Sequence, residues 1–340
     1  MKNWKKAGLT ALAGSLVATS AYAGAVTVSG TANLTYTAKS GKQDTGGLAA
    51  DTHQIGNDGN RWGLNKTISF AGSGELDNGW TISVSQSLNA GSTTGVGITL
   101  DMGDAGSLNF EADTGARGIG KIADMMPTAD EDVGNGIDVD GSGTVGGLSG
   151  GVSGGTKGFH YSKTVSDMVE LGIGYAPKGA TPGGPGSIQG SGAVASTVSG
   201  FVKLDPMDGL EIGLGIGEGP GGNANAALTT DYETIYATYV YGNLTLGYQM
   251  SEVDNPSTAA DDEQTRWGVL YAVNDEMSIS YQSHENDDST NSVDEEGTGV
   301  SASYTSGGMT FKVHRNTADD VGNAASNESE HTEVGVTFAF

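Results

Sequence analysis

Apolar and polar residues alternate at every second position of this chain, and this period limits its fold more than any other feature. The last eleven residues, EHTEVGVTFAF, place Val334, Val336, Phe338 and Phe340 on one parity and mainly polar or small residues on the other. Because successive side chains of a β-strand point to opposite faces, such a segment presents one apolar face and one polar face. Apolar residues at helical spacing do not occur after residue 23. The sequence therefore predicts an all-β fold.

The connectors between the alternating segments are short and long in turn. Short connectors, each with the Gly, Asn, Asp or Pro of a tight turn, lie at 75–79, 103–106, 165–167, 205–209, 241–243, 273–276 and 306–308. Longer polar stretches lie near 39–60, 90–94, 114–156, 178–191, 218–230, 253–261, 285–296 and 317–329. Together they divide the chain into about 16 strands. Only a closed sheet leaves no backbone edge unpaired in hydrocarbon, so the pattern predicts a transmembrane antiparallel β-barrel, wide enough to hold water.

The first 23 residues have the features of a cleaved secretory signal. Lys2, Lys5 and Lys6 precede an uncharged apolar stretch at 7–18, and Ala21-Tyr22-Ala23 supplies the small residues of a cleavage site. The apolar stretch is shorter than the ~20 residues that a membrane-spanning helix needs. We therefore predict that residues 1–23 are removed and that residues 24–340 form one barrel domain.

Composition excludes several classes of function. The chain has no Cys, which excludes disulfides, a Cys nucleophile and a Cys-based metal site. The formal net charge of −25 argues against nucleic acid as a partner. After residue 23 no apolar run approaches ~20 residues, so no transmembrane helix is expected.

Four segments stand out: RWGL at 61–64, the ELDNGW turn at 75–80, the LDMGDAGSLNFE hairpin at 100–111 and the closing strand that ends in Phe340. Together they resemble the Gram-negative general diffusion porins, most closely the alphaproteobacterial kind. The resemblance implies an outer-membrane channel for passive diffusion of ions and small hydrophilic solutes. It also implies contact with outer-membrane lipid and lipopolysaccharide, and a homotrimer. The second loop, 90–94, is too short for the subunit latch of that family.

In that family the third external loop folds into the lumen and narrows it. Here this loop is 114–156, the longest in the chain, and a disordered outer loop is the alternative for a stretch of this length. The resemblance implies an acidic side of the constriction and, by parity, a basic wall that faces it. The acidic side comprises Asp113, Asp124, Asp130, Glu131 and Asp132, and the basic wall comprises Arg61, Lys203, Arg266 and Lys312. Because acidic residues outnumber basic ones at the mouth, we expect weak cation selectivity.

Other interpretations stay open at this point. A secreted or surface-attached acidic, Gly-rich β protein, such as an adhesin, would also lack Cys, although no fixed repeat is present. We expect no enzyme activity, because no nucleophile can be named beside His160 or His314. We expect no cofactor, although the acidic loops could bind divalent cations loosely. Lys66 shares the parity of Leu64 and Ile68, so either a β-bulge near Asn65 turns it inward or it faces a partner subunit.

Overall fold

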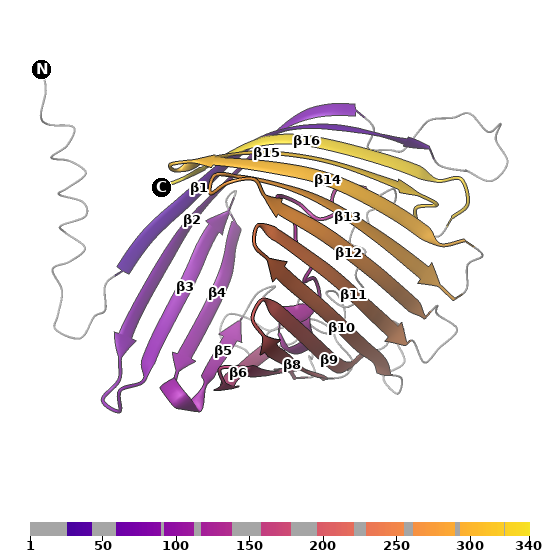
Figure 1. Ribbon diagram of the computed structural model, residues 1–340. Coiled ribbons are helices and arrows are strands. Elements are labelled where there is room, and N and C mark those ends of the chain that lie inside the picture. Colours follow the sequence, from indigo (N-terminus) through magenta and orange to yellow (C-terminus); the bar gives the residue numbers. More distant parts are fainter. Residues whose placement is uncertain are drawn as a thin grey trace, which may run out of the picture.

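The computed structural model describes residues 26–42, 59–89, 92–111, 117–137, 158–177, 196–220, 229–254, 261–289, 293–322 and 324–340. These residues form one closed barrel of 16 antiparallel strands (Figure 1). The predicted signal segment 1–23 and the predicted site residue Asp113 lie outside the described residues. The prediction of an all-β barrel with about 16 strands is confirmed.

The strands follow one another around the barrel in chain order. They are β1 (Val26–Lys42), β2 (Gly59–Glu75), β3 (Thr81–Asn89), β4 (Ser92–Asp101), β5 (Ser107–Glu111), β6 (Gly158–Ser166), β7 (Val169–Ala176), β8 (Thr197–Met207), β9 (Leu210–Pro220), β10 (Thr229–Tyr241), β11 (Leu244–Asp254), β12 (Asp262–Ala272), β13 (Met277–Asp288), β14 (Glu295–Ser306), β15 (Met309–Asp319) and β16 (Glu328–Ala339). Two 3₁₀ helices, η1 (Gly103–Ala105) and η2 (Gly118–Ile122), complete the described elements. None of the described helices is long and apolar enough to span a membrane.

The barrel closes between its first and last strands. β1 pairs with β16 in a continuous register that places Leu34 opposite Val336. The main chain of Phe340 extends this seam: its N–H donates to the Gly30 carbonyl at 3.0 Å, and its carbonyl accepts from the Gly30 N–H at 2.8 Å. Closure removes the open edge that a sheet would otherwise expose, which is the condition for placing strands in hydrocarbon.

The two faces of the wall differ as the alternation predicts. Along β10 exposed and buried residues alternate, with Ile235 on the outer face and Tyr236 on the inner one. Outward aromatic pairs lie on neighbouring strands, with ring centroids 5.1 Å apart for Tyr36 and Trp62 and 5.2 Å apart for Trp267 and Tyr281. An apolar outer surface with aromatic residues on it suits a bilayer.

The predicted tight turns occur where expected, and two other expectations are wrong. β4 already begins at Ser92, so the loop predicted at 90–94 is shorter, because Ser92–Thr94 pair with β3. The bulge expected near Asn65 does not occur, because β1 and β2 pair without a shift from Val26 and Gly72 to Lys39 and Gly59. Lys66 therefore lies on the outer face, where its long side chain can carry the ammonium group toward water.

Candidate functional site

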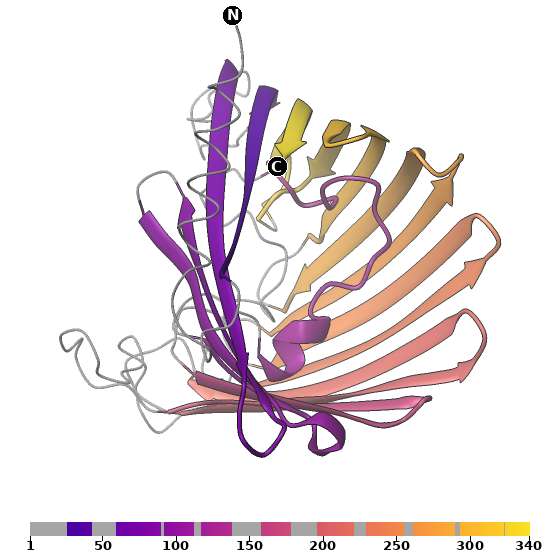
Figure 2. The same cartoon turned by 90° about the vertical axis from the view of Figure 1, so that its left-hand side faces the viewer.

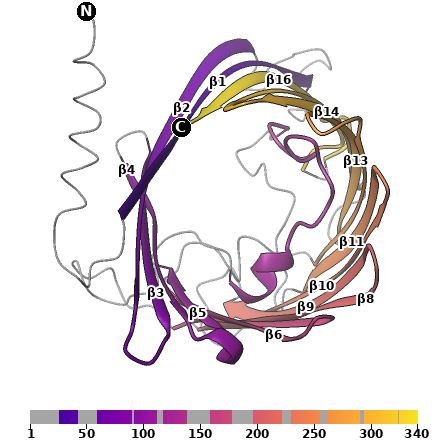
Figure 3. The ribbon, with the colours of Figure 1, turned by 60° about the vertical axis from the view of Figure 1, so that its left-hand side comes forward.

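Residues 117–137, which we call the inner segment, lie inside the barrel. Figures 2 and 3 show this magenta segment following the inner side of the wall, with η2 near its start. Ile119 and Ile122 of η2 are fully buried in an apolar cluster with Phe201, Tyr232, Tyr236 and Val253 of the wall. Burying two such side chains stabilises the docked position by about 1.5–3 kcal/mol each. The other parts of the predicted third loop, residues 114–116 and 138–156, lie outside the described residues.

Polar side chains of the wall bind the main chain of the inner segment. Gln249 of β11 makes the densest set: its Nε2 donates to the Ile122 carbonyl at 2.8 Å and the Ala123 carbonyl at 3.2 Å, and its Oε1 accepts from the Met125 N–H at 2.9 Å. Other described wall residues that bind segment main chain include His160, Ser199, Ser280, Gln282 and Asn316. Since these contacts use the backbone, they position the segment without using its acidic side chains.

Glycines on the inner face give the segment room to approach the wall. A Cβ at Gly174 of β7 would overlap the main chain of Arg117 and Gly118, and a Cβ at Gly247 of β11 would overlap Pro127. A Cβ at Gly215 would overlap the side chains of Ile119 and Ile122, and a Cβ at Gly299 would lie in tight contact with Val133. Part of the high glycine content therefore serves close packing inside the barrel.

Two of the four predicted basic wall residues bind predicted acidic residues directly. Arg266 NH1 lies 2.8 Å from Asp124 Oδ2, and Lys312 Nζ lies 2.6 Å from Asp130 Oδ1. The prediction placed these charges on opposite sides of the lumen. The two pairs are instead in contact, because the inner segment lies against β12–β15 rather than across from them.

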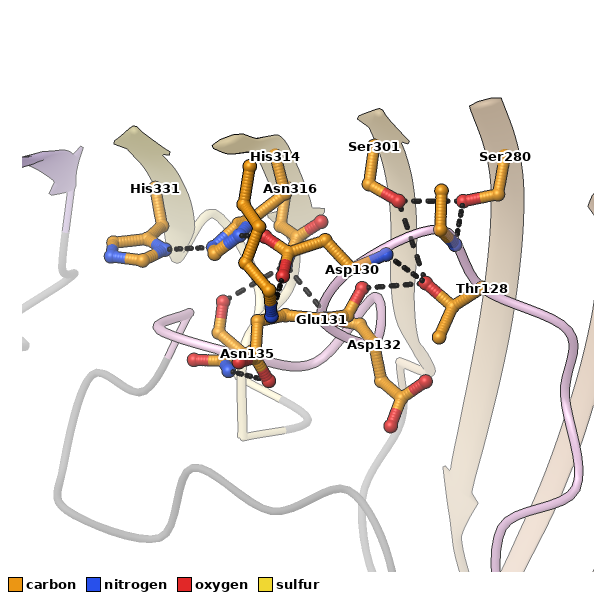
Figure 4. A network of polar contacts seen from close by, with 12 residues as sticks. Thr128, Asp130, Glu131, Asp132, Asn135, Ser280, Ser301, His314, Asn316 and His331 are labelled. Atoms are coloured by element: carbon orange, nitrogen blue, oxygen red, sulfur yellow. Dashed lines mark hydrogen bonds and ion pairs between the residues drawn. The ribbon is translucent and has the colours of Figure 1, made fainter. Parts of the chain in front are cut away.

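Asp130 is the most enclosed of the predicted acidic residues. His314 Nδ1 lies 3.1 Å from its Oδ2, and His314 Nε2 lies 3.2 Å from Nδ1 of His331 (Figure 4). Burial alone would raise the pKa of the Asp130 carboxyl, but hydrogen bonds from His314 and Lys312 outweigh burial, so its pKa lies below the ordinary value. Asp130 is therefore ionised and serves as an anchor.

The other described residues of the predicted site lie outside these two ion pairs. Glu131 is exposed and accepts a hydrogen bond from Asn135 Nδ2 at 2.7 Å, and Asp132 is half-buried. Lys203 of β8 lies opposite Glu170 of β7 with its ammonium 5.8 Å from the Phe201 ring centre. Arg61 lies beside Thr37 of β1, away from the inner segment's contacts.

The sequence did not identify the glutamine, asparagine and histidine contacts of the wall. His314 and His331 are separated along the chain, but β15 and β16 bring them together. His314 shares the parity of the predicted wall residue Lys312, which indicates that it faces the lumen, but nothing in the sequence indicates which neighbour it meets. Among the described residues no group of three or more Asp, Glu, His or Cys side chains is placed to hold a metal ion.

Comparison with known proteins agrees with this architecture. Residues 8–340 match the Gram-negative porin family. Solved structures with the same fold include an anion-selective porin from Comamonas acidovorans, with 15% identity, a TM-score of 0.62 and coverage of 93% of this chain and 99% of that one. OmpT of Vibrio cholerae has 13% identity, a TM-score of 0.63 and coverage of 95% and 99%.

A variant of the Rh. blastica porin has 13% identity, a TM-score of 0.61 and coverage of 93% and 100%. No curated protein sequence matches the chain. At these identities the solved structures show a shared fold, whereas the family match extends over nearly the whole chain. The closed barrel and this match together decide the assignment: the chain belongs to the Gram-negative porin family.

Proposed function

We propose that this outer-membrane diffusion channel has a weak preference for cations. The observation that supports the proposal is which charged side chains at the inner segment form ion pairs and which do not. Arg266 and Lys312 are each occupied by a carboxylate. Within the part of the chain that the structure describes, Glu131 and Asp132 make no ion pair. Unbalanced negative charge in a narrow passage concentrates cations.

The main alternative to this proposal is that the channel prefers anions. The Comamonas acidovorans porin is anion-selective, but at 15% identity it shares only the fold with this chain. Lys203 and Arg61 belong to the inward-facing set and make no ion pair among the described residues. If these two dominate the field in the lumen, anions would be preferred, so the sign of the selectivity is the quantity to measure.

Purified protein in planar bilayers should give discrete steps of ion conductance. In a potassium chloride gradient at low salt, the reversal potential should indicate preference for K⁺ over Cl⁻, and this preference should fade as salt shortens the screening length to ~3 Å at 1 M. Heat-denatured protein is the control and should give no steps. Folded protein without conductance would refute the channel, and anion preference at low salt would refute the proposed selectivity.

We also propose that Phe340 matters more for assembly than for the folded barrel. Its two main-chain hydrogen bonds to Gly30 contribute about 0.5–1.5 kcal/mol each. Deleting Phe340 should therefore lower the temperature of barrel unfolding only slightly, but should strongly lower the amount of protein in the outer membrane. Quantitative blotting of membrane fractions would measure the second effect. Normal membrane levels of the shortened chain would contradict the proposal.

The exposed apolar outer surface indicates which molecules the barrel contacts. We propose that the apolar outer face contacts outer-membrane lipid and lipopolysaccharide, and that the barrel assembles as a homotrimer. Trp62 and Leu64 of β2 leave 72% and 71% of their surfaces exposed, which offers apolar area for a second copy or for lipid. Cross-linking in native membranes distinguishes the trimer from a lipid-covered monomer.

A further inference from the structure

Two histidines on neighbouring strands of the wall, His314 and His331, are in direct contact, and we call them the histidine pair. Nε2 of His314 lies 3.2 Å from Nδ1 of His331, and the two ring centroids lie 5.1 Å apart. Both residues are buried, with 1% and 6% of their surfaces exposed. The other nitrogen of His314, Nδ1, lies 3.1 Å from Asp130 Oδ2. His314 therefore lies between His331 and the inner segment, as Figure 4 shows.

The contact between the two rings has room for one hydrogen only. A neutral imidazole has one N–H donor and one acceptor nitrogen, whereas an imidazolium has two donors and no acceptor. While at least one ring is neutral, the N–H of one ring can donate to the free nitrogen of the other. If both rings are protonated, two N–H groups point at each other and two cations are in contact. The histidine pair can therefore hold its hydrogen bond with one positive charge, but not with two.

The charged groups around the histidine pair do not compensate a second positive charge. Among the described residues, the charged groups that face the pair are Asp130 and Glu131 of the inner segment, Lys39 of β1, Arg61 of β2, Lys312 of β15 and Glu333 of β16. β14 places the uncharged Ser301 opposite His314. Cations and carboxylates are equal in number in this set, and Asp130 is already shared between Lys312 and His314. Two imidazolium groups would therefore repel each other without an excess of negative charge nearby.

His331 also lies against the end of the inner segment. A Cβ at Gly136 would overlap the His331 ring, so the main chain of the segment passes directly beside that ring. Gly136 has a φ of 75°, which glycine adopts without strain, and the next residue, Ile137, packs in an apolar cluster with Ala318 and Val321. A displaced His331 ring would therefore push on the main chain that leads into this cluster.

We propose that the histidine pair is an acid-sensitive contact that holds the end of the inner segment, residues 134–137, against the wall. Protonation of both rings breaks their hydrogen bond, and the displaced His331 ring releases this end. The ordinary histidine pKa of ~6.5 places the change on the acid side of neutrality. Asp130 stays ionised and bound to Lys312 there, because its pKa lies below the ordinary carboxyl value. The anchor at Asp130 is thus retained, and only the end beyond it moves.

The test is single-channel recording of the full-length protein at constant salt, at pH ~7.5 and at pH ~4.5, which bracket the ordinary histidine pKa. Wild type should give steady conductance steps at the higher pH and fluctuating steps at the lower one. His331→Gln should give steady steps at both, because an amide gains no charge in acid. His284→Gln is the matched control: His284 is also a buried inner-face histidine, but its partner is Glu295, so this variant should fluctuate in acid as wild type does.

Nitrogen-15 NMR of histidine-labelled protein gives a second readout that does not depend on ion flow. The inference rests on the proposed channel, but it is independent of whether cations or anions are preferred. In wild type, the signals that are missing from His331→Gln and His314→Gln should change to those of imidazolium over the pH range in which the steps begin to fluctuate. Steady wild-type steps in acid, acid-induced fluctuation that persists in His331→Gln, or fluctuation while one ring stays neutral would each overturn the inference. Silent bilayers from protein whose two rings both protonate would refute the channel alone.

Discussion

Replacing Asp130 with alanine should release the inner segment from β15 and raise the single-channel conductance. The Asp130 carboxylate is 96% buried and is contacted by both Lys312 and His314. Removing one partner of a buried ion pair costs about 3–5 kcal/mol, because the remaining charge is left uncompensated. Lys312 is about one-third exposed, so the lower end of that range applies here. At about 1.4 kcal/mol per factor of ten, the docked population should fall on the order of 100-fold relative to the released one.

Bilayer recordings of Asp130→Ala should show larger or fluctuating steps, because the segment no longer holds one position. Glu131→Ala is the matched control, since the neighbouring side chain is exposed and bonds only within the inner segment. Its conductance steps should stay close in size to those of wild type. If Asp130→Ala gives the same steady steps as Glu131→Ala, the contacts of Asp130 do not hold the segment in place.

The sequence predicted the barrel because outer-face alternation and turn chemistry are local properties. Segments such as Leu244–Met250 have a simple apolar stripe, and β11 forms there. In β10 the alternation indicates a strand, but it does not indicate what the inner face contacts. Tyr232 and Tyr236 place aromatic rings on the inner face, where they pack against η2. Apolar residues on both faces obscure the period, and only the fold reveals what the inner ones contact.

The site was predicted by residue type but not by arrangement. Asp124, Asp130, Arg266 and Lys312 were all expected to matter for the charge of the lumen. Parity tells which face a side chain occupies, but it does not tell which residue of a distant loop will meet it. The ion pairs depend on where the inner segment docks, which is decided by main-chain contacts with Gln249, whose role no sequence pattern indicates.

Gly174→Val should have the second large effect, by keeping the start of the inner segment off the wall. The added side chain would overlap the main chain of Arg117 and Gly118 rather than a movable side-chain tip. Overpacking of this kind costs about 1–3 kcal/mol. Displacement would also expose Ile119 and Ile122, which adds about 1.5–3 kcal/mol for each side chain returned to water. The temperature at which heat converts the folded barrel to the unfolded form should therefore fall clearly.

Gly72→Val provides the matched control for this effect. Gly72 also lies within a strand, but a Cβ there meets only Val26, at an ordinary 3.8 Å. Valine suits strands better than glycine does, so this variant should unfold at or above the wild-type temperature. Gel mobility after stepwise heating would measure both variants under the same conditions. Equal unfolding temperatures for Gly174→Val and Gly72→Val would mean that the close approach at Gly174 contributes nothing to holding the inner segment, and that the apolar cluster around η2 tolerates displacement.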